Sequence, residues 1–96
     1  MPPEISEVTV QHNPAQNCFE TTIDGFRSVL EYERRNGEIV MTHTFVPSEL
    51  RGRGVAEKLV RAALNYARVE QRRVVPTCSY VDLFIRRHPE FQTLVD

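Results

Sequence analysis

The sequence feature that most constrains the fold is a glycine turn between an extended apolar segment and the longest helical pattern in the chain. The turn spans residues 46–56 and holds Gly52 and Gly54 beside Arg51 and Arg53. Glycines leave the backbone bare, and the first N–H groups of the following helix have no internal acceptor. These amides, the helix dipole and two guanidinium groups together favour a phosphate or pyrophosphate. The sequence therefore predicts an anion site, against the alternative of an ordinary glycine-containing turn.

Two common phosphate-binding motifs do not match this turn. A P-loop requires a Lys-Ser or Lys-Thr pair after its last glycine, whereas Gly54 is followed by Val55 and Ala56. A dinucleotide fingerprint that begins at Gly52 requires a further glycine where the chain has Glu57. The ligand must therefore belong to another class of phosphate compound.

A third signature does match. Residues 51–56 read Arg-Gly-Arg-Gly-Val-Ala, which resembles the [QR]xxGx[GA] pattern of the GNAT superfamily of acetyl-CoA-dependent N-acetyltransferases. The segments 76–81 and 84–91 are similar to a small, single-domain branch of that superfamily. The resemblance covers about residues 37–96. It implies transfer of an acetyl group from acetyl-CoA, as co-substrate, to an amine on a small molecule or protein, with no metal.

Length and composition favour one domain. A chain of 96 residues with 41% hydrophobic content can build one core, so we expect residues 1–96 to form a single domain. The formal net charge of −1 gives no global basic field, which disfavours nucleic acid as a partner. We find no signal peptide and no apolar run of about eighteen residues. With only Cys18 and Cys78, the sequence indicates a reduced, cytoplasmic protein without membrane contact, monomeric or weakly dimeric.

Alternating apolar and polar residues predict an antiparallel meander in the first half of the chain. The hairpin signals Asp24-Gly25 and Asn36-Gly37 separate the later strands. In the last of these strands, we expect His43 to share a face with Met41 and Phe45, and both faces are apolar, which indicates a central position. Cys18 is expected on the polar face of its strand, without a role. The expected segments are an extended stretch at 4–11, a turn at 12–17, and strands at 18–24, 26–34 and 38–46.

The second half predicts a crossover to a parallel strand. Apolar residues at helical spacing indicate a helix from Val55 to about Glu70, and Val74 and Val75 then open a strand parallel to 38–46. A second helix is expected at 79–88. Because proline has no N–H to donate, Pro76 indicates that the fourth and fifth strands part, near Val46 on the other side. The expected fold is α/β (α+β): a mixed, mostly antiparallel sheet of about five strands, splayed between strands 4 and 5, with two helices.

The resemblance assigns the cofactor-binding residues to two groups. The pantetheine arm and the acyl oxygen would be held by the backbone at the end of the fourth strand, and the pyrophosphate by the glycine turn. The first group is Thr44, Phe45 and Val46; the second is Arg51, Gly52, Arg53, Gly54, Val55 and Ala56.

Three side chains are candidates for catalysis. Cys78, at the start of the second helix, is the best nucleophile, although a small thiol there could simply pack beneath the cofactor. Tyr80 could protonate the leaving CoA thiolate, or its hydroxyl could merely face water. His43 could act as a general base, but its apolar neighbours favour a packed core histidine.

Departures from the family pattern leave other functions open. Typical members place one or two helices between their first two strands and carry a tyrosine as general acid where this chain has Phe84, Ile85 and Arg86. A non-catalytic acyl-CoA-binding module is therefore the alternative. A nucleic-acid module is disfavoured by the net charge; it would use Arg51, Arg53, Arg72 and Arg73.

Overall fold

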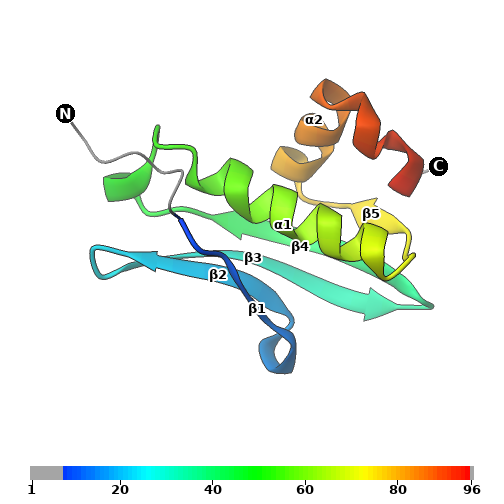
Figure 1. The fold of residues 1–96 in the computed structure, drawn as a ribbon, viewed down its shortest axis with the longest axis horizontal. Helices are drawn as coiled ribbons and strands as arrows, with labels where there is room; N and C mark the ends of the chain where they lie inside the picture. The colour runs from blue at the N-terminus through cyan, green and yellow to red at the C-terminus, as the bar shows by residue number, and fades with distance from the viewer. Residues whose placement is uncertain (1–7, 96) are drawn as a thin grey trace.

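The chain folds into a five-stranded sheet with two α-helices (Figure 1). The computed structural model describes residues 8–95. The predicted mixed α/β fold is confirmed. In chain order the elements are β1 (Gln11–Asn13), η2 (Pro14–Gln16), β2 (Cys18–Ile23), β3 (Phe26–Arg35), β4 (Glu38–Phe45), η3 (Ser48–Leu50), α1 (Val55–Val69), β5 (Val74–Pro76), α2 (Ser79–Arg87) and η4 (Pro89–Leu94), where η marks a 3-10 helix.

The strands lie in the sheet in chain order, β1-β2-β3-β4-β5. The first four pair antiparallel, and each two-residue hairpin turn has both residues in the left-handed region that such turns require. Asp24 and Gly25 have φ values of 52° and 83°, and Asn36 and Gly37 have 54° and 81°. α1 carries the chain back across the sheet, so that β5 pairs parallel with β4. The predicted hairpins and crossover are thus confirmed.

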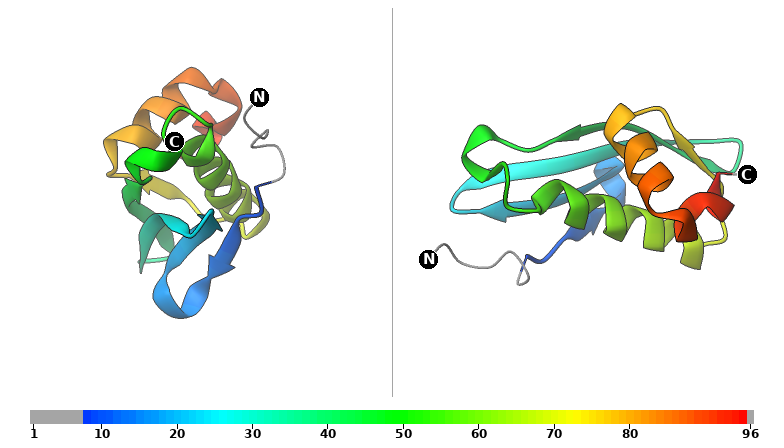
Figure 2. Two further views of the ribbon diagram at one scale, coloured as in Figure 1. Left: turned by 90° about the vertical axis from the view of Figure 1, so that its left-hand side faces the viewer. Right: turned by 90° about the horizontal axis from the view of Figure 1, so that it is seen from above.

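The core lies on one side of the sheet. α1 and α2 both pack on this side, as the views in Figure 2 illustrate, and within residues 8–95 no helix covers the opposite face. We call that opposite side the open face. The core is formed by residues of α1 (Val55, Leu59, Val60, Ala63, Leu64, Ala67), of the sheet (Phe19, Leu30, Tyr32, Ile39, Met41, Val74), of α2 (Val81, Phe84, Ile85) and of the η segments (Leu50, Phe91, Leu94).

The first strand differs from the prediction. The expected turn at 12–17 begins later, because β1 includes His12, which pairs with Phe19. The imidazole stacks on the Phe19 ring with centroids 4.2 Å apart, and its Nε2 lies 2.7 Å from Tyr32 Oη. These contacts outweigh the local tendency of this segment to turn. Residues 4–7, half of the extended stretch expected at 4–11, lie outside the described residues.

His12 should make the stability of the fold depend on pH. Burial lowers its pKa from 6.5, the Arg34 guanidinium lowers it further, and Glu70 partly opposes both effects. Near and below pH 6.5 the unfolded chain therefore takes up a proton at this position more readily than the folded chain. The free energy of unfolding should decrease as the pH is lowered. We expect His12→Gln to weaken this dependence between about pH 7 and pH 5, measured by urea denaturation. An unchanged slope in the variant would contradict this assignment.

Candidate functional site

The glycine turn adopts the conformation that the sequence predicts. Gly52 and Gly54 have φ values of 78° and 80°, in the left-handed region, and Gly54 is the N-cap of α1. The first bond of the helix runs from Lys58 N to Gly54 O, at 3.2 Å. No side chain caps this helix start. The N–H groups of residues 55–57 therefore lack intrahelical acceptors and are available to a ligand.

Two adjoining hollows surround this helix start. One, of about 260 Å³, lies over the turn, and the other, of about 340 Å³, lies at the end of β4. Four residues line both hollows, so together they form one continuous depression. The first is lined by Val46, Leu50, Arg51, Gly52, Gly54, Val55, Ala56, Glu57 and Tyr80, and the second by Thr44, Phe45, Val46, Arg51, Ala56 and Tyr80. Every residue predicted to bind the cofactor except Arg53 lines one of them.

The two arginines of the turn point to different places. Arg51 lines both hollows, and its Nε donates a hydrogen bond to Val46 O at 3.2 Å. The Arg53 side chain instead approaches the β2–β3 hairpin, with Nη1 3.9 Å from Asp24 Oδ2. Its buried Nε has no hydrogen-bond partner among the described residues. The Arg53 guanidinium is thus directed toward Asp24 and lines neither hollow, and its role at the anion site stays a prediction.

β4 and β5 part as the proline predicted, but earlier along β4. Their register ends at Met41 and Pro76, not near Val46. Beyond this point Cys78 N donates to Met41 O at 2.9 Å, and Thr77 N turns back to Val75 O at 3.0 Å. The end of β4 from Thr42 onward therefore has no strand beside it on the β5 side within the described chain. This gap begins deeper in the sheet than the sequence indicated.

A β-bulge in β4 changes which residues face the core. Tyr32 pairs with Met41 and Glu31 with His43, so Thr42 is the extra residue. Met41 is buried on the helix side, but three residues later it is Thr44 that lies on that side, beside Leu30. His43 is therefore exposed on the open face. The expectation of a packed core histidine, on one face with Met41, is wrong.

Cys78 and Tyr80 lie at the N-terminus of α2, across the gap from β4. Cys78 is the N-cap of α2, and its Sγ lies 3.5 Å from Thr44 Oγ1. Tyr80 is 40% exposed and lines both hollows. Burial, and then the Glu57 carboxylate, raise the pKa of the Tyr80 hydroxyl, so it is protonated at neutral pH. Tyr80 thus lines the depression directly, and the Cys78 thiol lies behind Thr44, which lines the hollow at the end of β4.

Sequence reasoning missed several residues of this region. Glu57 was not among the predicted site residues, but it lines the hollow over the turn together with Tyr80 of α2. A further hollow of about 130 Å³ continues from Tyr80 along α2 to Leu83 and Arg87. The spacing of Tyr80, Leu83 and Arg87 on one helix face was the signal that could have identified them. Arg86, by contrast, pairs with Asp82 at 3.1 Å, as a solvated face would suggest.

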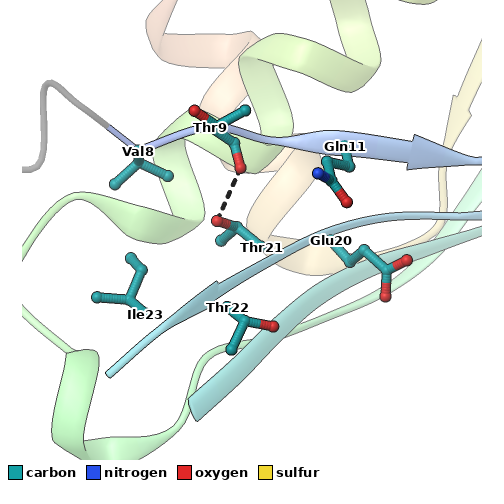
Figure 3. A pocket seen from close by; sticks show the side chains of 7 residues that line it. All are labelled: Val8, Thr9, Gln11, Glu20, Thr21, Thr22 and Ile23. Atoms are coloured by element: carbon teal, nitrogen blue, oxygen red, sulfur yellow. Dashed lines mark hydrogen bonds between the residues drawn. The ribbon is translucent and has the colours of Figure 1, made fainter. Parts of the chain in front are cut away.

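A larger hollow lies elsewhere, between the segment before β1 and the edge of β2 (Figure 3). It measures about 550 Å³, and one hydrogen bond crosses it, from Thr21 Oγ1 to Thr9 O at 2.9 Å. None of the residues predicted to bind or catalyse lines it. Its size alone therefore does not make it the candidate site.

Comparison with known proteins decides the family. A model described as GCN5-related N-acetyl-transferase matches residues 18–94. The chain belongs to the GCN5-related N-acetyltransferase family. The match extends well beyond the residues that carried the resemblance in the sequence.

Relatives and solved structures agree with this family. The chain is 36% identical to Protein NATD1 of Bos taurus over 85 residues, which is 85% of this chain and 75% of that protein. It is 34% identical to Protein NATD1 of Homo sapiens over 85 residues, again 85% of this chain and 75% of that protein. A GCN5-like protein of Staphylococcus aureus, whose solution structure was determined by NMR, superposes with a TM-score of 0.73 at 25% identity. That superposition covers 95% of this chain and 90% of the other.

Membership in the GCN5-related N-acetyltransferase family places the chain among acyl-transfer proteins that generally use acetyl-CoA as co-substrate. In the part of the chain that the structure describes, no three His, Cys, Asp or Glu side chains are grouped to hold a metal ion. None of the helices in residues 8–95 is long and apolar enough to cross a membrane. Both cysteines have free thiols.

Proposed function

We propose that this protein transfers an acetyl group from acetyl-CoA to an amine. The observation that carries the proposal is the adjacency of two features: an uncapped helix start and a strand end without a neighbour. The hollows at these two places share Val46, Arg51, Ala56 and Tyr80. A ligand with a diphosphate at one end and an extended amide chain at the other fits such a continuous depression.

The diphosphate would lie against the N–H groups of residues 55–57, with Arg51 beside it. The helix dipole and the free amides both favour an anion there. Glu57 opposes this preference because its carboxylate lines the same hollow. Its charge is partly compensated by Arg61, whose Nε lies 3.9 Å away. We therefore assign most of the phosphate binding to the backbone and to Arg51.

The extended arm would lie along the end of β4. Backbone groups of Thr44 to Val46 are the partners we propose for its amides, as a short stretch of added strand pairing. Acetyl-CoA supplies the acetyl group as an activated thioester. Held in this orientation, its carbonyl would lie near Tyr80 and Thr44, and Cys78 is in contact with Thr44.

Two routes of transfer are compatible with these residues. In the direct route the neutral amine nitrogen bonds to the acetyl carbon, the C–S bond breaks, and the CoA sulfur takes a proton from Tyr80. The nitrogen then gives up its excess proton, which restores the Tyr80 hydroxyl. In the covalent route the Cys78 sulfur first takes the acetyl group while its proton passes to the CoA sulfur. The amine then attacks the new thioester and regenerates the Cys78 thiol. Tyr80 suits the first route because its raised pKa keeps it protonated.

Release of free CoA tests the proposal. The protein would be incubated with acetyl-CoA and a panel of primary amines, and the free thiol measured with a coupled colour reagent. We expect release that depends on the amine and saturates with its concentration. Stabilisation by acetyl-CoA in a melting experiment without release for any amine would favour the binding module instead. Absence of both would overturn the proposal.

A further inference from the structure

The β-bulge presents an aromatic ring, an imidazole and a carboxylate together on the open face. Glu31 pairs with His43 and Val29 with Phe45 in the β3–β4 register, so the side chains of each pair lie on the same side of the sheet. Leu30 and Thr44, between them, face the helices. We call Glu31, His43 and Phe45 the bulge triad. Without the bulge, His43 and Phe45 would have faced the core.

Glu31 forms no direct ion pair within the described part of the sheet, and its charge is offset only by the longer-range attraction of the Arg27 guanidinium. The neighbouring carboxylates on the open face are paired with arginines: Glu20 with Arg27, at 2.7 Å, and Glu33 with Arg35. Among residues 8–95, Glu31 is exposed and forms no ion pair. A carboxylate left over beside an imidazole favours a cationic group that comes from outside the chain.

The bulge triad is connected to the depression on the helix side. Phe45 is 46% exposed on the open face, and it also lines the hollow of about 340 Å³ together with Thr44 and Tyr80. Phe45 therefore adjoins both the hollow and the open face, at the edge of β4 where β5 no longer pairs. A donor held over α1 and an acceptor held on the open face would meet at this edge.

We propose that the amine acceptor binds at the bulge triad as a primary ammonium on a flexible chain, of the kind a lysine side chain carries. This rests on the proposed acetyl transfer. The Glu31 carboxylate attracts the ammonium, and the face of the Phe45 ring adds a cation–π contact. His43 takes the ammonium proton and leaves the nitrogen lone pair free to bond to the acetyl carbon. As the C–S bond breaks, the CoA sulfur takes a proton from Tyr80, and the nitrogen loses its second proton, which restores the Tyr80 hydroxyl. The first proton, held on His43, passes to solvent.

Charge-neutral variants on the same strand test this site. The probe is a blocked Ala-Lys-Ala peptide, with blocked Ala-Gln-Ala as the uncharged control. Glu31→Gln should raise KM for the lysine peptide about two- to fivefold, the size expected for one exposed charge contact. Glu33→Gln is the matched control, because the Glu33 carboxylate is already paired with Arg35. Stabilisation by acetyl-CoA should be unchanged in both variants.

A binding measurement gives a second readout that does not need turnover. In amide NMR spectra, the lysine peptide should shift the signals of His43 and Phe45 in the wild type, and much less in Glu31→Gln. The glutamine peptide should not shift them. If Glu31→Gln and Glu33→Gln behave alike in both measurements, or if the shifted signals lie on another face, this acceptor site is wrong. If the wild type nevertheless releases CoA in the presence of amines, the proposed acetyl transfer is supported and only the proposed acceptor site is contradicted.

Discussion

Gly54→Asp should abolish the thermal stabilisation that acetyl-CoA confers, whereas Gly54→Asn should keep most of it. Gly54 has φ 80°, and Asn and Asp are the non-glycine residues that best tolerate this conformation. A Cβ at this position would meet no atom within 4 Å, so neither side chain is forced into a clash. The two substitutions have nearly the same shape, and only Asp adds a negative charge at the start of α1. Their difference therefore reports on charge alone.

Melting curves with and without ligand measure this effect. At about 100 times its Kd, a ligand stabilises the fold by about 2.7 kcal/mol, or roughly 10–20 °C for a domain of this size. We expect a shift of this order in the wild type and close to none in Gly54→Asp. Without ligand, both variants should melt slightly below the wild type, by similar amounts, since both occupy a left-handed position. If acetyl-CoA raised the melting temperature of both variants equally, the glycine turn would not be part of the binding site.

Features encoded by neighbouring residues could be predicted from the sequence. The glycine turn, the two hairpins and the helix starting at Val55 each depend on a few adjacent positions with strong backbone preferences. The end of pairing at Pro76 belongs to the same class, because a missing N–H ends a ladder wherever it falls. These local signals were sufficient to indicate the order of the strands and the existence of the gap, but not the residue of β4 at which the gap begins.

The bulge in β4 could not be predicted, and it decides the direction of His43. No glycine or proline marks Thr42. Because both faces of the strand are apolar, the pattern of apolar residues could not show which side chains face the core after that position. The extra residue is stabilised by β3, since Thr42 Oγ1 donates to Glu31 O at 3.2 Å. A contact between strands thus reversed the predicted orientation of every residue after it.

The directions of the side chains at the start of α1 could not be predicted from the sequence either. Arg53 turns to Asp24 because the β2–β3 hairpin lies beside the glycine turn, an adjacency that only the folded sheet creates. Glu57 occupies a helix position that reads as solvent-facing, yet α2 and Tyr80 border it. The candidate site combines a predictable backbone with side chains that tertiary neighbours orient.

Cys78→Ala should eliminate a covalent acetyl adduct and lower the rate of CoA release at least about a hundredfold, if the covalent route operates. The adduct is sought by mass spectrometry after incubation with acetyl-CoA and no amine. Cys78 Sγ has only one polar neighbour, Thr44 Oγ1 at 3.5 Å, within the described chain, and it lies at the edge of the gap. Cys18→Ala is the matched control. Cys18 is 2% exposed, and burial raises the pKa of its thiol, so it should form no adduct.

The same variants distinguish a reactive thiol from a packed one. If Cys78 only fills space beside Thr44, the wild type forms no adduct, and Cys78→Ala still releases CoA, because the direct route through Tyr80 needs no thiol. Cys78→Ser then separates volume from nucleophilicity, since the hydroxyl nearly preserves the packing but is a far weaker nucleophile at neutral pH. Loss of release in Cys78→Ser together with a wild-type adduct at Cys78 would establish the covalent route. Full release in Cys78→Ser with no adduct would assign the chemistry to direct attack by the amine.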